Sequence, residues 1–119
     1  MAATAYTPTV SAAAGTVLAA PAAVDAANGN SWVNTNREII EITNGAGAPI
    51  TATFTTYGTY DVGSVAYAIA DLSVTIVNGT TKVCGPFDRT LFNDPDGLVI
   101  VNWSSGTTIT ARVITLGTA

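Results

Sequence analysis

The sequence contains no histidine and only one cysteine, Cys84. The absence of histidine removes the commonest general base, the Ser–His nucleophile pair and the commonest metal ligand. One cysteine cannot form an internal disulfide. A reactive thiol needs an activating base or cations, and only Lys82 lies nearby in the sequence. We therefore expect no enzymatic activity, no metal and no cofactor, and interpret Cys84 as a small buried side chain.

Charge is also scarce in this chain. Charged residues make up 10% of it, and 4 cations against 8 acids leave a net charge of −4. Binding to a nucleic-acid backbone takes many Lys and Arg contacts, which these few scattered cations cannot provide (Arg37, Lys82, Arg89 and Arg112). No stretch approaches the roughly 20 apolar residues of a membrane-spanning helix. The sequence therefore predicts neither a nucleic-acid partner nor a membrane partner.

Residues 1–30 are rich in Ala and Thr and carry one charge, Asp25. They show neither the period of a strand nor that of a helix. We expect an extended N-terminal arm here, in which Tyr6–Val10 is extended or an edge strand, because an edge tolerates Pro8. Ordering such an arm costs about 1 to 2 kcal/mol of backbone entropy per residue, and Ala buries little surface in return. The arm is therefore predicted to gain its order by packing on another chain.

Residues 31–119 are predicted to form one β-domain. In Ile50–Thr56 and Leu72–Val77 apolar residues alternate with Ser or Thr, which is the pattern of half-buried strands. Asn78-Gly79 is a strong hairpin signal, and turn signals recur about every 8 to 12 residues, as in a sandwich or barrel. No convincing helix period occurs. The expected fold is therefore all-β: a small two-sheet β-sandwich, jelly-roll or immunoglobulin-like, with an extended N-terminal arm.

The same alternation predicts which side chains fill the core between the two sheets. We expect these to be Ile40, Ile42, Phe54, Val74, Ile76, Ile100 and Val113. Leu98–Trp103 is nearly all apolar, so we interpret it as a strand covered on both faces.

Asp88, Asp94 and Asp96 form the best acidic cluster. Asp94-x-Asp96-Gly97 resembles the start of a Ca²⁺ loop, but the spaced third acid and the closing bidentate Glu are missing. Asn-Asp-Pro-Asp-Gly is also what a tight turn before a strand requires. We therefore predict a turn here in preference to a cation site.

Several aromatic residues lie outside the expected strands. Tyr57, Tyr60 and Tyr67 fall in a long connection from Tyr57 to Ala70, with a weaker strand signal over Ser64–Ala70, and Trp32 ends the arm. Tyr and Trp in loops are typical of protein interfaces; a sugar-stacking platform and plugging of the sandwich ends are the alternatives. With the start of the arm, they make up the predicted partner-binding set: Tyr6, Thr7, Pro8, Thr9, Val10, Trp32, Tyr57, Tyr60 and Tyr67.

Four short segments follow one another along the domain: an Asn-x-x-Arg-Glu motif with an apolar strand at Asn34–Ile40, then Gly85–Phe87, Asn93–Gly97 and Val99–Ser105. In these segments, over about residues 32–116, the chain resembles small structural proteins of tailed phages, the capsid decoration or head cement proteins. It departs from them at Val77–Thr80, where similar proteins often have a Pro-Ala-Gly-like hairpin, and in its Ala-rich arm.

The resemblance implies a non-enzymatic virion protein that binds the outer surface of a phage capsid and stabilises it, after assembly in the host cytoplasm. It implies the major capsid protein as partner, and a homo-oligomer with a trimer favoured. The family offers no catalytic residues. A phage tail or fibre subunit and a carbohydrate-binding β-sandwich module are the alternative functions.

Overall fold

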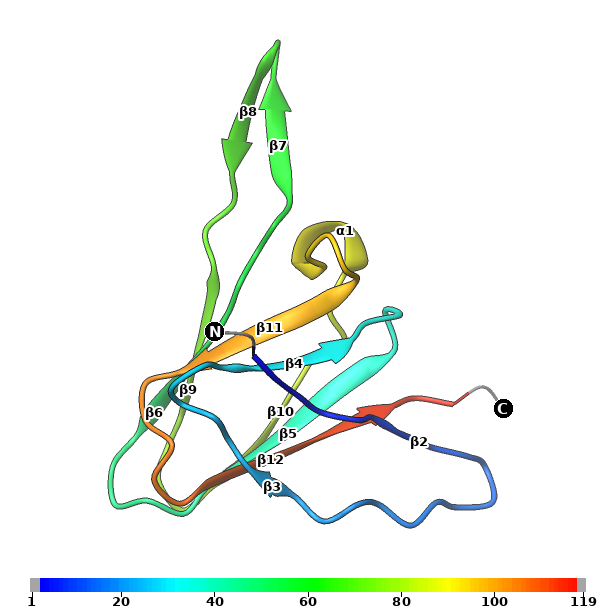
Figure 1. The fold of residues 1–119 in the computed structure, drawn as a ribbon, viewed down its shortest axis with the longest axis vertical. Helices are drawn as coiled ribbons and strands as arrows, with labels where there is room; N and C mark the ends of the chain where they lie inside the picture. Colours follow the sequence, from blue (N-terminus) through cyan, green and yellow to red (C-terminus); the bar gives the residue numbers. More distant parts are fainter. Residues whose placement is uncertain (1–2, 118–119) are drawn as a thin grey trace.

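The computed structural model describes residues 3–117, and their strands form two large sheets and one projecting hairpin (Figure 1). The first sheet has the strand order β1-β4-β11-β6-β9, and the second has the order β10-β5-β12-β2, with β3 also paired to β12. The bounds of the first sheet are β1 Thr4–Ala5, β4 Asn30–Val33, β11 Leu98–Trp103, β6 Ile50–Phe54 and β9 Leu72–Ile76. Those of the second are β10 Thr81–Cys84, β5 Glu38–Asn44, β12 Ile109–Thr115, β2 Thr9–Val10 and β3 Ala22–Ala23.

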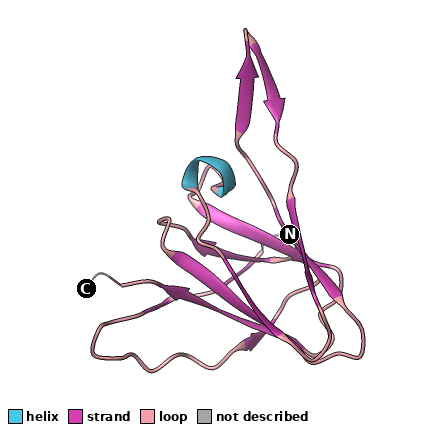
Figure 2. Cartoon of the chain, turned by 180° about the vertical axis from the view of Figure 1, so that it is seen from behind, coloured by secondary structure: helices cyan, strands magenta, loops and turns pink. Residues whose placement is uncertain are grey.

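The two sheets pack face to face, which confirms the predicted all-β sandwich (Figure 2). Most connections cross from one sheet to the other: β4 leads to β5, β5 to β6, β9 to β10, and β11 to β12. The alternation expected in Ile50–Thr56 is seen in β6, where every second residue is buried, and the same pattern occurs in β5 and in β12 as far as Val113. In β9, where it was also expected, Ile76 is buried but Val74 is only partly buried. Period-two burial therefore builds the core, as in other half-buried strands.

A cluster of four aromatic rings forms part of the core. The Phe54 ring centroid lies 4.8 Å from that of Phe87 and 6.5 Å from that of Trp32. Phe92 meets Phe87 edge-on at 5.3 Å. Edge-to-face and tilted pairs at these distances add about 0.5 to 1.5 kcal/mol beyond the area they bury. These four rings draw together β4, β6 and the segment that precedes β11.

The predicted core is correct at five positions and needs two changes. Those five are buried: Ile40, Ile42, Phe54, Ile76 and Val113. Val74 is partly buried and packs against the core. Ile100 was wrongly placed, because its neighbours Val99 and Val101 are both 0% exposed. Ile100 therefore lies on the outer face of β11, a strand whose nearly continuous apolar run hides which face turns inward.

Trp32 was also expected in the wrong place, at a contact surface. It is 1% exposed, because β4 begins at Asn30 and directs this ring between the sheets. The expected absence of helix needs one small correction, since Arg89–Phe92 forms a single turn, α1. Its N-cap Asp88 accepts a hydrogen bond from the Thr90 N–H at 2.8 Å. Within residues 3–117, no helix has the length and apolar character needed to cross a membrane.

The N-terminal segment, residues 3–29, is called the strap here because it lies along its own sandwich. β1 pairs in parallel with β4, β2 pairs in parallel with β12, and β3 pairs antiparallel with β12. The segment is largely extended, as expected. Its described residues pair with the same chain, and contact with a second chain stays a prediction.

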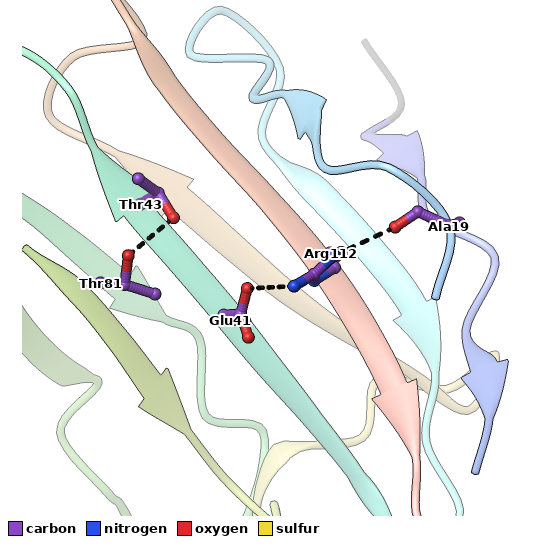
Figure 3. A network of polar contacts seen from close by, with 5 residues as sticks. All are labelled: Ala19, Glu41, Thr43, Thr81 and Arg112. Carbon is purple, nitrogen blue, oxygen red and sulfur yellow. Dashed lines mark hydrogen bonds and ion pairs between the residues drawn. The ribbon is translucent and has the colours of Figure 1, made fainter. Parts of the chain in front are cut away.

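Polar groups hold the strap to both sheets. The buried Asn30 amide accepts from the Asp25 N–H and the Trp103 Nε1, both at 2.9 Å, and donates to the Thr4 carbonyl at 3.1 Å. On the outer face of the second sheet, Arg112 contacts Glu41 at 2.8 Å and donates to the Ala19 carbonyl at 3.4 Å (Figure 3). The strap is therefore held by the buried Asn30 amide at one end and by the hydrogen bond from Arg112 to the Ala19 carbonyl further along.

Candidate functional site

A hairpin projects well beyond the sandwich, within the long connection expected from the sequence, and its second strand lies in Ser64–Ala70, where a weaker strand signal was noted (Figures 1 and 2). It consists of β7 (Thr59–Val62) and β8 (Val65–Ala68), which form a two-stranded sheet of their own. The turn between them is Gly63-Ser64. Gly63 has a φ of 64°, a backbone conformation that residues with a Cβ rarely adopt.

The hairpin extends the β6–β9 pair past the edge of the sandwich. Phe54 is opposite Leu72 in the first sheet, and Thr59 is opposite Ala68 in the hairpin. Residues 55–58 therefore stand against residues 69–71, which is one residue more on the first strand than on the second. An extra residue of this kind bends and twists a pair of strands. The offset accordingly marks where the hairpin leaves the plane of the sheet.

Thr56 and Asp71 hold this offset together. The Asp71 carboxylate accepts from the Thr56 N–H at 2.9 Å and from the Thr56 hydroxyl at 3.2 Å. The single proton of this hydroxyl is shared with the Ile69 carbonyl oxygen, which lies closer to it, at 2.5 Å. These contacts replace ladder hydrogen bonds that the shifted register interrupts, so the joint stays closed.

A second contact clamps the base of the hairpin onto α1. The N–H groups of Tyr57 and Gly58 both donate to the Leu91 carbonyl, at 2.8 and 3.0 Å. A Cβ on Gly58 would lie 2.8 Å from the Thr90 carbonyl oxygen, closer than real Cβ contacts come. This position therefore needs glycine, and α1 supports the base of the hairpin through these hydrogen bonds.

Beyond this clamp the hairpin presents apolar side chains to solvent. Val62 is 60% exposed, Val65 51% and Tyr67 46%. Val62 is opposite Val65 in the register, and Tyr67 is two residues further along β8, so all three share one face, called the hairpin face here. Asp61 is the only charged residue of the two strands. Exposed apolar residues gathered on one projecting element are typical of an interaction surface.

The predicted partner-binding residues do not form one surface. Tyr67 belongs to the hairpin face, Tyr57 lies at its base and is 44% exposed, and the side chain of Tyr60 falls outside the described part. Trp32 is in the core. Val62 and Val65 were missed, although Gly63-Ser64 between two short β-rich runs is a hairpin signal that would have found them.

The residues predicted in the arm belong to the strap and lie on the opposite side of the sandwich from the hairpin, where the strap meets β12. Tyr6 is partly buried, and this burial raises its pKa to about 12. Its hydroxyl donates to the Ala22 carbonyl at 3.4 Å. Thr7 and Pro8 continue to β2, and Thr9 and Val10 pair with β12. These residues close one side of the sandwich, apart from the hairpin face.

Three of the four segments that carried the family resemblance, Asn34–Ile40, Gly85–Phe87 and Asn93–Gly97, are joined by hydrogen bonds at one end of the sandwich. The buried Asn34 amide donates to the Phe87 carbonyl at 2.9 Å and to the Asn93 side chain at 2.7 Å. The Asn36 side chain accepts from the Arg89 N–H at 2.7 Å. These motif residues therefore hold loops in place by satisfying buried polar groups.

Glu38 belongs to the same loop-holding network and is 2% exposed. Burial disfavours its charged form, but the N–H of Thr35 and the hydroxyls of Thr115 and Thr35 donate to the carboxylate, and the pKa of Glu38 is lowered as a result. Hydrogen bonds to an ionised carboxylate are stronger than neutral ones. The charge therefore fixes the turn from β4 into β5.

The acidic cluster makes a turn, as predicted. One Asp94 carboxylate oxygen accepts from the N–H groups of Asp96 and Leu98, both at 2.9 Å. A depression of about 330 Å³ lies beside it, with Leu98 and Ile100 among its lining. Among the described residues, no group of three or more His, Cys, Asp or Glu side chains could hold a metal ion.

Cys84 is half-buried. Burial raises the pKa of its thiol, whereas the charge of Lys82 acts in the opposite direction.

Comparison with known proteins adds no relative to this picture. No family model matches the chain, and neither a curated protein nor a solved structure matches it.

Proposed function

We propose that this chain is a non-enzymatic binding protein that attaches to the outer shell of a phage capsid through its hairpin face and stabilises the particle. The proposal names a protein surface as partner because the face consists of two valines and a tyrosine on a projecting element. Aromatic and apolar side chains are what the fully buried centre of a protein interface contains.

One observation carries the proposal: the hairpin face is exposed, while the base of the same hairpin is fixed. Thr56 is held by Asp71, and the N–H groups of Tyr57 and Gly58 are held by Leu91. A two-stranded hairpin is marginal by itself in water, so the joint and the α1 clamp keep it in one orientation. An element presented in its bound orientation loses less entropy on binding.

The choice of a capsid shell rests on the resemblance to decoration proteins. A symmetric shell offers many copies of the same site, so a small apolar contact of modest affinity is repeated over the particle. In an oligomer that spans several sites, avidity strengthens attachment further. The major capsid protein is the expected partner, and the virion is the expected location of the chain.

Electron cryomicroscopy of the native particle tests this proposal. The control is a particle from a phage in which the gene for this chain is deleted. We expect extra density on the outside of the head, with the projecting hairpin directed towards the shell. Density in the tail or fibres would support the tail subunit instead. Retardation of the purified protein in a polysaccharide gel, with no density on the head, would support a carbohydrate-binding module. Either result would overturn the capsid assignment.

A further inference from the structure

The strap covers the sheet edges on one side of the sandwich and leaves them open on the other. On one side the strap adds β1 to the edge of the first sheet and β2 beside β12 in the second. On the other side, the outermost strands within residues 3–117 are β9 and β10. A sheet edge carries backbone groups that can pair with another strand. The open side is therefore the place where the main sheets can be extended.

The pairing of β6 shows which backbone groups of β9 face outward. The Thr51 carbonyl accepts from the Ser104 N–H at 2.9 Å, and the Thr51 N–H donates to the Ser104 hydroxyl at 2.8 Å, so Thr51 is turned away from β9. Thr75 is opposite Thr51. In an antiparallel ladder, residues alternate between the two sides. Thr75 and, two residues earlier, Ser73 therefore direct their N–H and C=O groups to the free edge.

The Lys82 side chain covers part of this edge. It is opposite the fully buried Ile42, so it points to the inner side of β10, and its ammonium donates to the Thr75 carbonyl at 3.1 Å. An inward-pointing lysine at an edge limits uncontrolled pairing. It occupies one acceptor position of one carbonyl, which has two, and leaves the N–H groups of Ser73 and Thr75 facing outward.

The β9 edge is complementary to itself. Its two outward residues lie symmetrically about Val74, and Leu72–Ile76 contains no charge although the chain carries a net charge of −4. Two copies can thus meet there without opposed carboxylates in the strand. Leu72 and Val77 are 43% and 54% exposed beside this edge, and a second copy would partly cover them.

We infer that two copies of this chain pair through β9, antiparallel and about a twofold axis at Val74. Ser73 of each copy exchanges backbone hydrogen bonds with Thr75 of the other, and the two first sheets become one continuous sheet. This pairing uses neither the hairpin face nor the strap. It is independent of the proposed function, and it gives a dimer in place of the trimer that the resemblance implies.

Disulfide trapping tests the register of the pairing. Facing residues of a non-hydrogen-bonded antiparallel pair have Cα atoms about 4.5 Å apart, within the range of about 4.4 to 6.8 Å that a disulfide spans. In a Cys84→Ser background, Val74→Cys should form a disulfide-linked dimer under mild oxidation. Ser73→Cys, which would face Thr75 of the second copy, is the matched control and should stay monomeric on a non-reducing gel.

Equal cross-linking of both variants would indicate random collision and would overturn the inference, as would no cross-linking of folded Val74→Cys protein. The unmodified chain provides a second test that needs no substitution. The Ser73 and Thr75 amides should exchange slowly at high protein concentration and quickly on dilution. Fast exchange at every concentration, or a sedimentation mass of three chains, would also contradict a twofold dimer.

Discussion

Asp71 accepts hydrogen bonds from both the backbone N–H and the hydroxyl of Thr56, at the point where the register between two strands shifts by one residue. One carboxylate thus joins the β6–β9 pair, which belongs to the sandwich, to the β7–β8 pair, which projects into solvent. The orientation of the hairpin face depends on this joint and on the contact of Gly58 with α1. Changing the joint should therefore affect the hairpin more than it affects the core.

Asp71→Ala should loosen the hairpin while the sandwich stays folded. Each lost hydrogen bond is worth about 0.5 to 1.5 kcal/mol, a modest part of the stability of a typical domain. Amide exchange should accelerate in Thr59–Ala68 and remain slow in Ile50–Phe54. Asp61→Ala removes the same kind of side chain from the hairpin outside the joint and serves as the control. If the two variants exchange alike, the joint does not set the hairpin's stability.

Asn30→Ala should release the strap. It removes the acceptor of the Trp103 Nε1 and of the Asp25 N–H, and an orphaned buried donor costs about 1 to 3 kcal/mol. Urea unfolding should show this loss, and amides of β1 should exchange faster. Asn102→Ala changes an exposed asparagine on the first sheet and should cost little. A strap that stays protected in the Asn30 variant would show that backbone pairing alone holds it.

The stability of the protein should fall in acid because of Glu38. Its folded-state pKa lies below the ordinary value, so its contribution is complete above the unfolded-state pKa and is lost as the pH falls through the folded-state pKa. Urea unfolding between about pH 7 and about pH 3 measures this dependence. Glu38→Gln should flatten the acid limb, whereas Glu41→Gln, on the outer face of β5, should leave most of it. An unchanged acid limb in the Glu38 variant would contradict the assignment.

Attachment to the partner should depend little on salt. Charged residues make up only 10% of the chain, and surface ion pairs contribute about 0 to 1 kcal/mol each. Retention on phage heads should therefore be similar between about 50 and about 500 mM NaCl, although the Debye length falls from roughly 14 to roughly 4 Å. Steep release over this range would indicate a charged docking face in place of an apolar one.

The strands that could be predicted from the sequence are those in which apolar and polar residues alternate clearly. Apolar residues alternate with Thr in β6 and with Thr110 and Arg112 in β12, so the inner faces of these strands could be predicted. The run Leu98–Trp103 has too few polar residues to show its period, and this is why Ile100 was placed on the wrong face. The two-residue strands of the strap are too short to produce a period, and they depend on tertiary contacts such as that of Asn30 with the Thr4 carbonyl.

The candidate site was predicted only in part, for a related reason. Tyr67 was chosen because aromatic residues in loops are common at interfaces, but an aromatic residue alone does not say whether it faces solvent. Trp32 looked equivalent in the sequence and turned out to be in the core. The hairpin itself could have been predicted from Gly63-Ser64, whereas its fixed base depends on Leu91, which is distant in the sequence.

The most direct measurement of the central claim is the affinity for phage heads of a variant in which Val62 and Val65 are both replaced by Ser. Each valine is about half exposed, so its burial on docking should contribute about 1 kcal/mol, and the double variant should bind roughly 30-fold more weakly. Val17→Ser, at a valine that is 94% exposed in the strap, is the control and should bind like the unmodified chain. Unchanged affinity of a folded Val62→Ser, Val65→Ser variant would contradict attachment through the hairpin face.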